Sequence, residues 1–132
     1  MIKETIKTSF VPMLAIENGT MNIDFYKNAF GAVELRRWSN DDGSIHVAEL
    51  KIEGAMFHLH EENPAKGAYS PKRHNGVSAT IGLMVADVDS VIARAVAAGA
   101  IVNSPAQDYE YGYRQGEITD AFGHRWLIET II

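Results

Sequence analysis

The same order of predicted elements occurs twice along this chain, and this repeat most narrows the folds that the chain can adopt. Each half shows a strand, an amphipathic helix and then three strands. We therefore predict an α+β fold of two βαβββ modules, at about residues 7–62 and 77–132. The segment between them, at 63–76, is rich in Pro, Gly and Asn and indicates a linker. Both modules are expected to form a single domain over 1–132.

The elements of the first module follow from short apolar runs and turn residues. A strand, a helix and three strands are predicted at Phe10–Ile16, Met21–Phe30, Val33–Trp38, Ile45–Ile52 and Ala55–Glu61. The last two strands flank Glu53-Gly54, which indicates a two-residue hairpin turn.

The second module repeats this order and ends in a hairpin. A strand is expected at Ser78–Val85, a helix capped by Asp87 and stopped by Gly99, and a short strand at Gln107–Tyr109. The closing hairpin is predicted at Tyr113–Thr119 and His124–Ile131, with a four-residue turn in which Gly123 takes a positive φ.

Composition and charge exclude several classes of partner. The chain has 132 residues, 46% hydrophobic and 22% charged, which is enough for one core. Its net charge of -5 is scattered and leaves no basic stripe, so neither nucleic acid nor an anionic membrane is an expected partner. Without cysteine there is no disulfide, and without an apolar leader or spanning run we predict a cytoplasmic protein.

An ordered series of residues in the closing hairpin points to a known family. The series is Gly112, Arg114, Gly116, Asp120, Phe122-Gly123-His124 and Trp126, and the first helix adds Asp24-Phe25-Tyr26 and Phe30-Gly31-Ala32. It resembles the vicinal-oxygen-chelate superfamily of glyoxalases, bleomycin-resistance proteins and dioxygenases, most closely the PhnB-like branch. That branch usually has Pro where this chain has Ala121. Pro would only pre-set φ at this turn position.

The resemblance implies sheets that curl into a cavity, with the helices outside. The predicted hairpins place Glu49 opposite His58 and Arg114 opposite Glu129. The ligand-binding set predicted from this strand alternation is Met13, His58, His60, Thr80, Met84, Arg114, Leu127 and Glu129, with Glu49 beside His58.

Metal-dependent members of that superfamily carry one His or Glu on the first and last strand of each repeat. Those places fall near Val11, at His58, near Thr80 and at Leu127, and only His58 can ligate a metal. We therefore predict no metal and no other cofactor. The alternative is a displaced divalent-metal site formed by His58, His60 and either Glu49 or Glu129. In a simpler interpretation these histidines are hydrogen-bonded polar residues on an accessible sheet face.

Arg114 also admits two interpretations. Its guanidinium either pairs across the strands with Glu129 or meets an anionic or carbonyl-bearing ligand.

Two functional hypotheses follow from the resemblance. The first is a homodimeric, metal-free protein that binds a small molecule, and sequesters a toxic ligand at the dimer interface. The second is a metal-dependent lyase, isomerase, epimerase or dioxygenase that acts on a substrate with vicinal oxygens. His58 would then be base or metal ligand, with Glu49 or Glu129 assisting.

Overall fold

Two four-stranded mixed sheets form the molecule, as a computed structural model of the chain that describes residues 5–132 shows. In the first sheet the strand order is β1-β4-β3-β2, with β1 parallel to β4 and the other pairs antiparallel. The elements of the first module are β1 (Met13–Ile16), α2 (Asp24–Phe30), β2 (Val33–Ser39), β3 (Ile45–Ile52) and β4 (Ala55–Glu61).

The second module repeats this order, and its sheet has the equivalent strand order β5-β8-β7-β6. Its elements are β5 (Thr80–Met84), α4 (Val88–Ala97), β6 (Ile101–Tyr109), β7 (Tyr113–Thr119) and β8 (Arg125–Ile131). Two mixed sheets with few helices confirm the predicted α+β fold of two βαβββ units.

The connecting segment is more ordered than a plain linker. It contains a 3-10 turn, η1 (Pro64–Lys66), and one helical turn, α3 (Pro71–His74). The buried Glu62 carboxylate fastens it, because it accepts hydrogen bonds from the Ser70 backbone N–H at 2.8 Å and from Arg73 Nη2 at 2.6 Å. That residues 63–76 separate the two modules remains a prediction.

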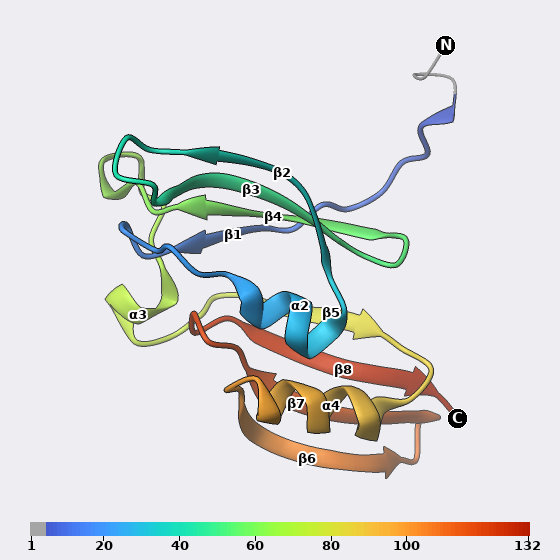
Figure 1. Cartoon of the computed structure of the whole chain (residues 1–132). Coiled ribbons are helices and arrows are strands. Elements are labelled where there is room, and N and C mark those ends of the chain that lie inside the picture. The colour runs from blue at the N-terminus through green and yellow to red at the C-terminus, as the bar shows by residue number, and fades with distance from the viewer. Residues whose placement is uncertain (1–4) are drawn as a thin grey trace.

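One apolar core lies between the two sheets. α2 lies between them, and α4 lies against the second sheet (Figure 1). Phe30 and Trp126 come from different modules, and their ring centroids are 4.9 Å apart; those of Tyr26 and Phe57 are 5.1 Å apart. Because the helix-covered faces of both sheets point into this core, the other face of each sheet points outward.

A buried carboxylate, Asp120, joins the modules at this core. It accepts hydrogen bonds from Tyr26 Oη of α2, from Trp126 Nε1 at 2.9 Å, and from the backbone N–H groups of Phe122 and His124. The His124 ring reaches β1, where Nε2 donates to the Ala15 carbonyl at 2.7 Å. The family motif therefore ties the closing turn to the first module.

The register of the closing hairpin differs from the predicted one by one residue. Thr119 faces Arg125, so five residues separate the two strands, and within the turn Asp120 N–H donates to the His124 carbonyl at 2.8 Å. Arg114 consequently pairs with Thr130, and Gln115 takes the expected place opposite Glu129. Gly123 has the predicted positive φ of 94°.

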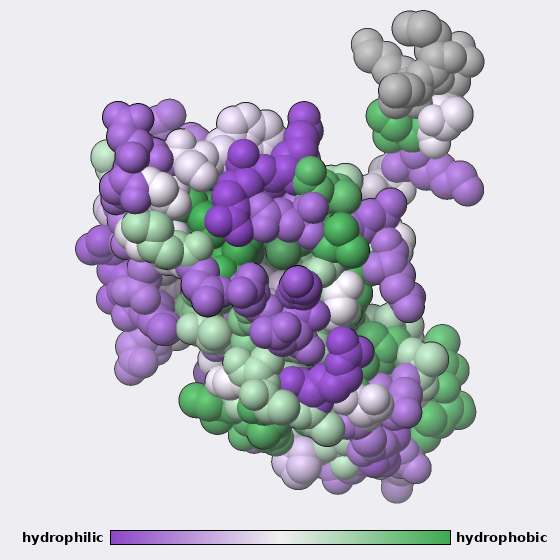
Figure 2. All heavy atoms as spheres, viewed as in Figure 1, coloured by the Kyte–Doolittle hydropathy of each residue, from purple (hydrophilic) through white to green (hydrophobic). Residues whose placement is uncertain are grey.

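Hydrophilic side chains cover much of the face seen in Figure 2, and apolar side chains gather around the second sheet near the C-terminus. No helix within residues 5–132 is long and apolar enough to cross a membrane.

Candidate functional site

The outward face of the first sheet brings together most of the side chains predicted on it. We call Met13, Arg36, Trp38, Glu49, His58 and His60 the N-face. Alternation along the strands places them on one side, since Met13 and Glu49 both lie beside His58 and Arg36 lies beside Glu49. The predicted pairing across the Glu53-Gly54 turn is confirmed at every position.

A row of polar contacts crosses the N-face from β2 to β4. Arg36 Nε and Nη2 donate to the two oxygens of Glu49 at 2.8 and 3.1 Å, and the guanidinium lies 5.0 Å from the centre of the Trp38 ring. These hydrogen bonds from Arg36 lower the pKa of Glu49. Glu49 is therefore an ionised carboxylate already committed to Arg36.

His58 lies at the end of this row without a close partner. Its Nε2 is buried and 3.5 Å from Glu49 Oε2, and it makes no hydrogen bond within the described residues 5–132. A carboxylate that orients a catalytic base normally lies at hydrogen-bond distance. The side chains of His58 and Glu49 are thus adjacent, as predicted, but no hydrogen bond connects them.

His60 faces a cavity at the end of the N-face. Its Nε2 lies 3.1 Å from the Met13 sulfur, and burial, followed by the nearby His58 and His46, lowers the pKa of His60. His60 is accordingly neutral at neutral pH. The adjoining cavity has a volume of about 550 Å³ and is lined by Met13, Val47, His60, Glu61 and Lys66, among others.

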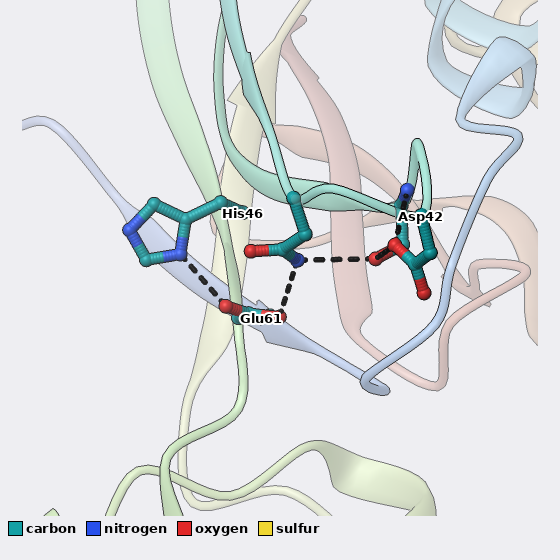
Figure 3. A network of polar contacts seen from close by, with 5 residues as sticks. Asp42, His46 and Glu61 are labelled. Atoms are coloured by element: carbon teal, nitrogen blue, oxygen red, sulfur yellow. Dashed lines mark hydrogen bonds and ion pairs between the residues drawn. The ribbon is translucent and has the colours of Figure 1, made fainter.

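Two residues that line this cavity, His46 and Glu61, belong to a polar network (Figure 3). Glu61 Oε1 accepts from His46 Nδ1 at 2.7 Å, and Oε2 accepts from Asn40 Nδ2 at 3.0 Å. Asn40 also donates to Ser44, whose hydroxyl donates to Asp42. Both Glu61 oxygens are engaged, so the network holds the 40–44 turn against β4 and shapes the cavity wall.

The outward face of the second sheet holds four of the predicted residues and one that was not predicted. We call Thr80, Met84, Gln115, Leu127 and Glu129 the C-face; they share one side of paired strands. Gln115 Nε2 donates to Glu129 Oε1 at 2.8 Å. Met84 has 53% of its surface exposed, so the C-face is open.

Arg114 does not lie on either face, and its predicted pairing with Glu129 across the strands is wrong. Its guanidinium donates to both oxygens of Asp89 on α4, at 2.8 and 2.9 Å, and to Asp108 at 3.0 Å. The one-residue shift of the closing hairpin turns Arg114 toward the helix-covered side. Its predicted ion pair with Glu129 is replaced by these two partners.

Sequence reasoning missed Arg36 on the N-face, as it missed Gln115 on the C-face. The position of Arg36 was visible in principle, because Arg36 and Trp38 alternate on one strand and face Glu49 on the next. The irregular pairing between Glu34 and Arg36 hides this relation from simple strand alternation.

Comparison with known proteins agrees with this architecture. The family model of the Glyoxalase/Bleomycin resistance protein/Dioxygenase superfamily matches residues 12–128. The chain belongs to this superfamily. An uncharacterized protein of Mycobacterium bovis is 36% identical over 126 residues, covering 93% of this chain and 83% of the relative. An uncharacterized protein of Arabidopsis thaliana is 30% identical over 130 residues, covering 91% of this chain and 77% of the relative.

Solved structures show the same superfamily fold. TioX from Micromonospora sp. ML1 superposes with a TM-score of 0.70 at 27% identity, covering 95% of this chain and 97% of TioX. The fosfomycin resistance protein FosX from Listeria monocytogenes superposes with a TM-score of 0.68 at 17% identity, covering 97% of this chain and 96% of FosX. The second likeness concerns the fold alone.

The residues of this superfamily member do not fit a divalent metal ion within one chain. Among residues 5–132 no three His, Asp or Glu side chains are grouped to hold an ion. In the displaced site, the His58 and His60 ring centroids are 6.0 Å apart, Glu49 is engaged by Arg36, and Glu129 belongs to the other sheet. A catalytic site needs about three convergent protein ligands, and residues 5–132 offer no such group.

Proposed function

We propose that this superfamily member binds a small organic molecule against the N-face and C-face without a bound metal ion, and sequesters a toxic ligand in this way. The observation that carries the proposal is the outward orientation of both faces with large apolar side chains left exposed. Met13 is 59% exposed on the N-face, where Trp38 on the opposite edge strand is also exposed, and Met84 is exposed on the C-face. Apolar surface rimmed by a few fixed polar groups is typical of ligand sites.

The polar groups of the N-face support binding rather than turnover. Both oxygens of Glu49 accept hydrogen bonds from Arg36, so this carboxylate is held as a fixed, ionised group. Fixed groups orient a ligand, whereas the ion pair with Arg36 lowers the pKa of Glu49 and makes this carboxylate a weaker general base.

We further propose a homodimer that encloses the ligand. The two faces point away from one shared core, so a ligand on either face stays partly in water until a second chain covers it. The absence of cysteine supports the proposed cytoplasmic location, and the resemblance to the PhnB-like branch remains a prediction.

One observation favours the second candidate, an enzyme with His58 as its base. His58 Nε2 is buried and makes no hydrogen bond among residues 5–132, and such groups often serve chemistry. In that case His58→Ala abolishes turnover with little change in the melting temperature.

The proposed binding is tested by nuclear magnetic resonance of chelator-treated, isotope-labelled protein titrated with small naphthalene derivatives. We expect chemical-shift changes at amides on and beside the N-face or C-face, while amides on the solvent side of α4 stay unchanged. Shifts scattered over the surface, or none below millimolar concentrations, would contradict the proposal.

A further inference from the structure

We propose that the C-face recognises a planar aromatic cation, whose ring stacks on Tyr111 and whose ammonium group pairs with Glu129. This inference rests on the proposed function, because it names the chemical class of the ligand at the same site. Three features carry it: a cluster of tyrosines, a carboxylate oxygen without a partner, and a glycine that leaves room for that oxygen.

The tyrosine cluster consists of Tyr109, Tyr111 and Tyr113 at the β6–β7 hairpin. The rings of Tyr109 and Tyr111 are stacked, with centroids 5.2 Å apart and an interplanar angle of 16°. The ring of Tyr113 lies next to them, with its centroid 6.0 Å from that of Tyr111. Tyr111 is nevertheless 64% exposed, so much of its ring surface remains accessible to a flat ligand.

Side-chain hydrogen bonds connect the cluster to the C-face. The Tyr111 hydroxyl donates to Gln115 Oε1, which leaves the amide nitrogen of Gln115 to donate to Glu129 Oε1 at 2.8 Å. These two hydrogen bonds fix both the exposed Tyr111 ring and the Glu129 carboxylate. A ligand therefore meets two recognition groups that are already positioned.

The second oxygen of Glu129 is uncommitted. Within residues 5–132 Glu129 has no ion-pair partner, and Oε2 makes no hydrogen bond. Oε2 lies over Gly82, where a Cβ atom would come within 2.9 Å of it. The missing side chain at position 82 leaves the space that this oxygen occupies.

The charges around Glu129 favour a cation as the occupant. Arg114, the basic residue next to Gln115 on β7, is turned to the other side of the sheet and bound by Asp89 and Asp108. The negative charge of Glu129 reaches the tyrosine cluster, where burial first, and then Tyr109 and Glu129, raise the pKa of Tyr111. A partly buried, unpaired carboxylate is costly, and an aromatic face also attracts cations. An anionic ligand would meet repulsion at the same place.

The test compares three naphthalene probes that differ in charge: 2-naphthylmethylammonium, 2-naphthylmethanol and 2-naphthoate. Dissociation constants are measured by titration calorimetry on the full chain at neutral pH. We expect the ammonium probe to bind about tenfold more tightly than the alcohol, since a charge-assisted hydrogen bond of this kind is worth a factor of that order. The carboxylate probe is expected to bind most weakly.

Variants assign the effect to the proposed groups. Glu129→Gln should reduce the affinity for the ammonium probe to that for the alcohol. Gly82→Ala should cause part of this loss, because the added Cβ displaces Oε2. Tyr111→Ala should weaken all three probes by a similar factor. Glu117→Gln is the matched control, because it removes a negative charge from the same face of the sheet, on the neighbouring strand β7, at a carboxylate already bound by Asn103.

Two outcomes overturn the proposal in different ways. Equal affinity for the three probes, or a loss in Glu117→Gln as large as in Glu129→Gln, would overturn the cation preference and leave the proposed binding function standing. Absence of binding by all three probes would overturn the proposed function on this face together with the inference.

Discussion

Asp120 is buried where the two modules meet, and four donors point at its two oxygens. They come from the α2 side chain Tyr26, from Trp126 on β8, and from two backbone N–H groups of the turn. An ionised carboxylate only accepts hydrogen bonds, so it satisfies all four donors at once. The asparagine amide, of the same shape, presents its N–H groups either to the Tyr26 and Trp126 donors or to the two backbone donors.

We therefore expect Asp120→Asn to lower the free energy of unfolding by about 3 kcal/mol, because it leaves buried donors without an acceptor. Urea denaturation measures this change. Asp41→Asn, which removes a charge from an exposed turn, is the control and should change stability little. Equal effects of the two substitutions would show that Asp120 is replaceable.

Glu62 predicts a dependence of stability on pH. Hydrogen bonds from Arg73 first, and then from the Ser70 backbone, lower the pKa of Glu62 to about 2. In the unfolded chain a glutamate has a pKa of about 4.3, so Glu62 binds a proton less readily in the folded state than in the unfolded state. The stability that Glu62 contributes is present above about pH 5 and is lost as the pH falls toward about 2.

Glu62→Gln removes this contribution, so its unfolding free energy should fall less steeply than that of the wild type between about pH 5 and pH 3. Denaturant unfolding at several pH values in this range gives the two slopes. Glu110→Gln, at an exposed turn position, should keep the wild-type slope. Parallel slopes for wild type and Glu62→Gln would refute the role of Glu62.

At the scale of elements, the two hairpins show what a sequence can and cannot specify. The β3–β4 register was predictable because Glu53-Gly54 is a two-residue turn between clearly alternating strands. The β7–β8 register was predicted one residue out, because side-chain and backbone bonds of Asp120 draw His124 into the turn. Local composition does not report such contacts, and one residue was enough to misplace Arg114.

β6 is a second case of this limit. The sequence predicts a short strand at Gln107–Tyr109, yet the strand begins at Ile101, before Pro105, and runs to Tyr109. Pairing with β7 is irregular on both sides of Ser104, so the proline lies where a ladder bond is not needed. An edge strand with bulges tolerates Pro that a central strand would not.

The contact between α4 and β7 depends on Gly116. A Cβ atom there would lie 2.4 Å from Ile92 Cδ1 of the helix and 3.1 Å from the Ala106 backbone. We expect Gly116→Ala to destabilise the fold by about 1–3 kcal/mol through overpacking. Gly76→Ala, where nothing lies within 4 Å, is the matched control, and thermal unfolding compares them. Similar melting temperatures for both variants would mean that α4 can move away at no cost.

For the whole molecule, the repeat predicted the architecture and strand alternation predicted most of both faces. Met13, Glu49, His58, His60, Thr80, Met84, Leu127 and Glu129 lie on the outward faces as expected. Strand alternation does not predict which charged side chains pair with each other. Arg36 commits Glu49, and two aspartates commit Arg114, and these pairings decide which groups remain for a ligand.

Metal-independent binding is the central claim, and melting of chelator-treated protein with Ni, Zn, Mn, Co, Fe(II) and Mg ions tests it most directly. Binding to the folded state raises the melting temperature, and His58→Ala removes the one imidazole at a ligand position of the family. We predict that no ion stabilises the wild type more than the His58→Ala variant. A rise of several degrees with one ion, absent from the variant, would contradict the account and support a metal-dependent enzyme.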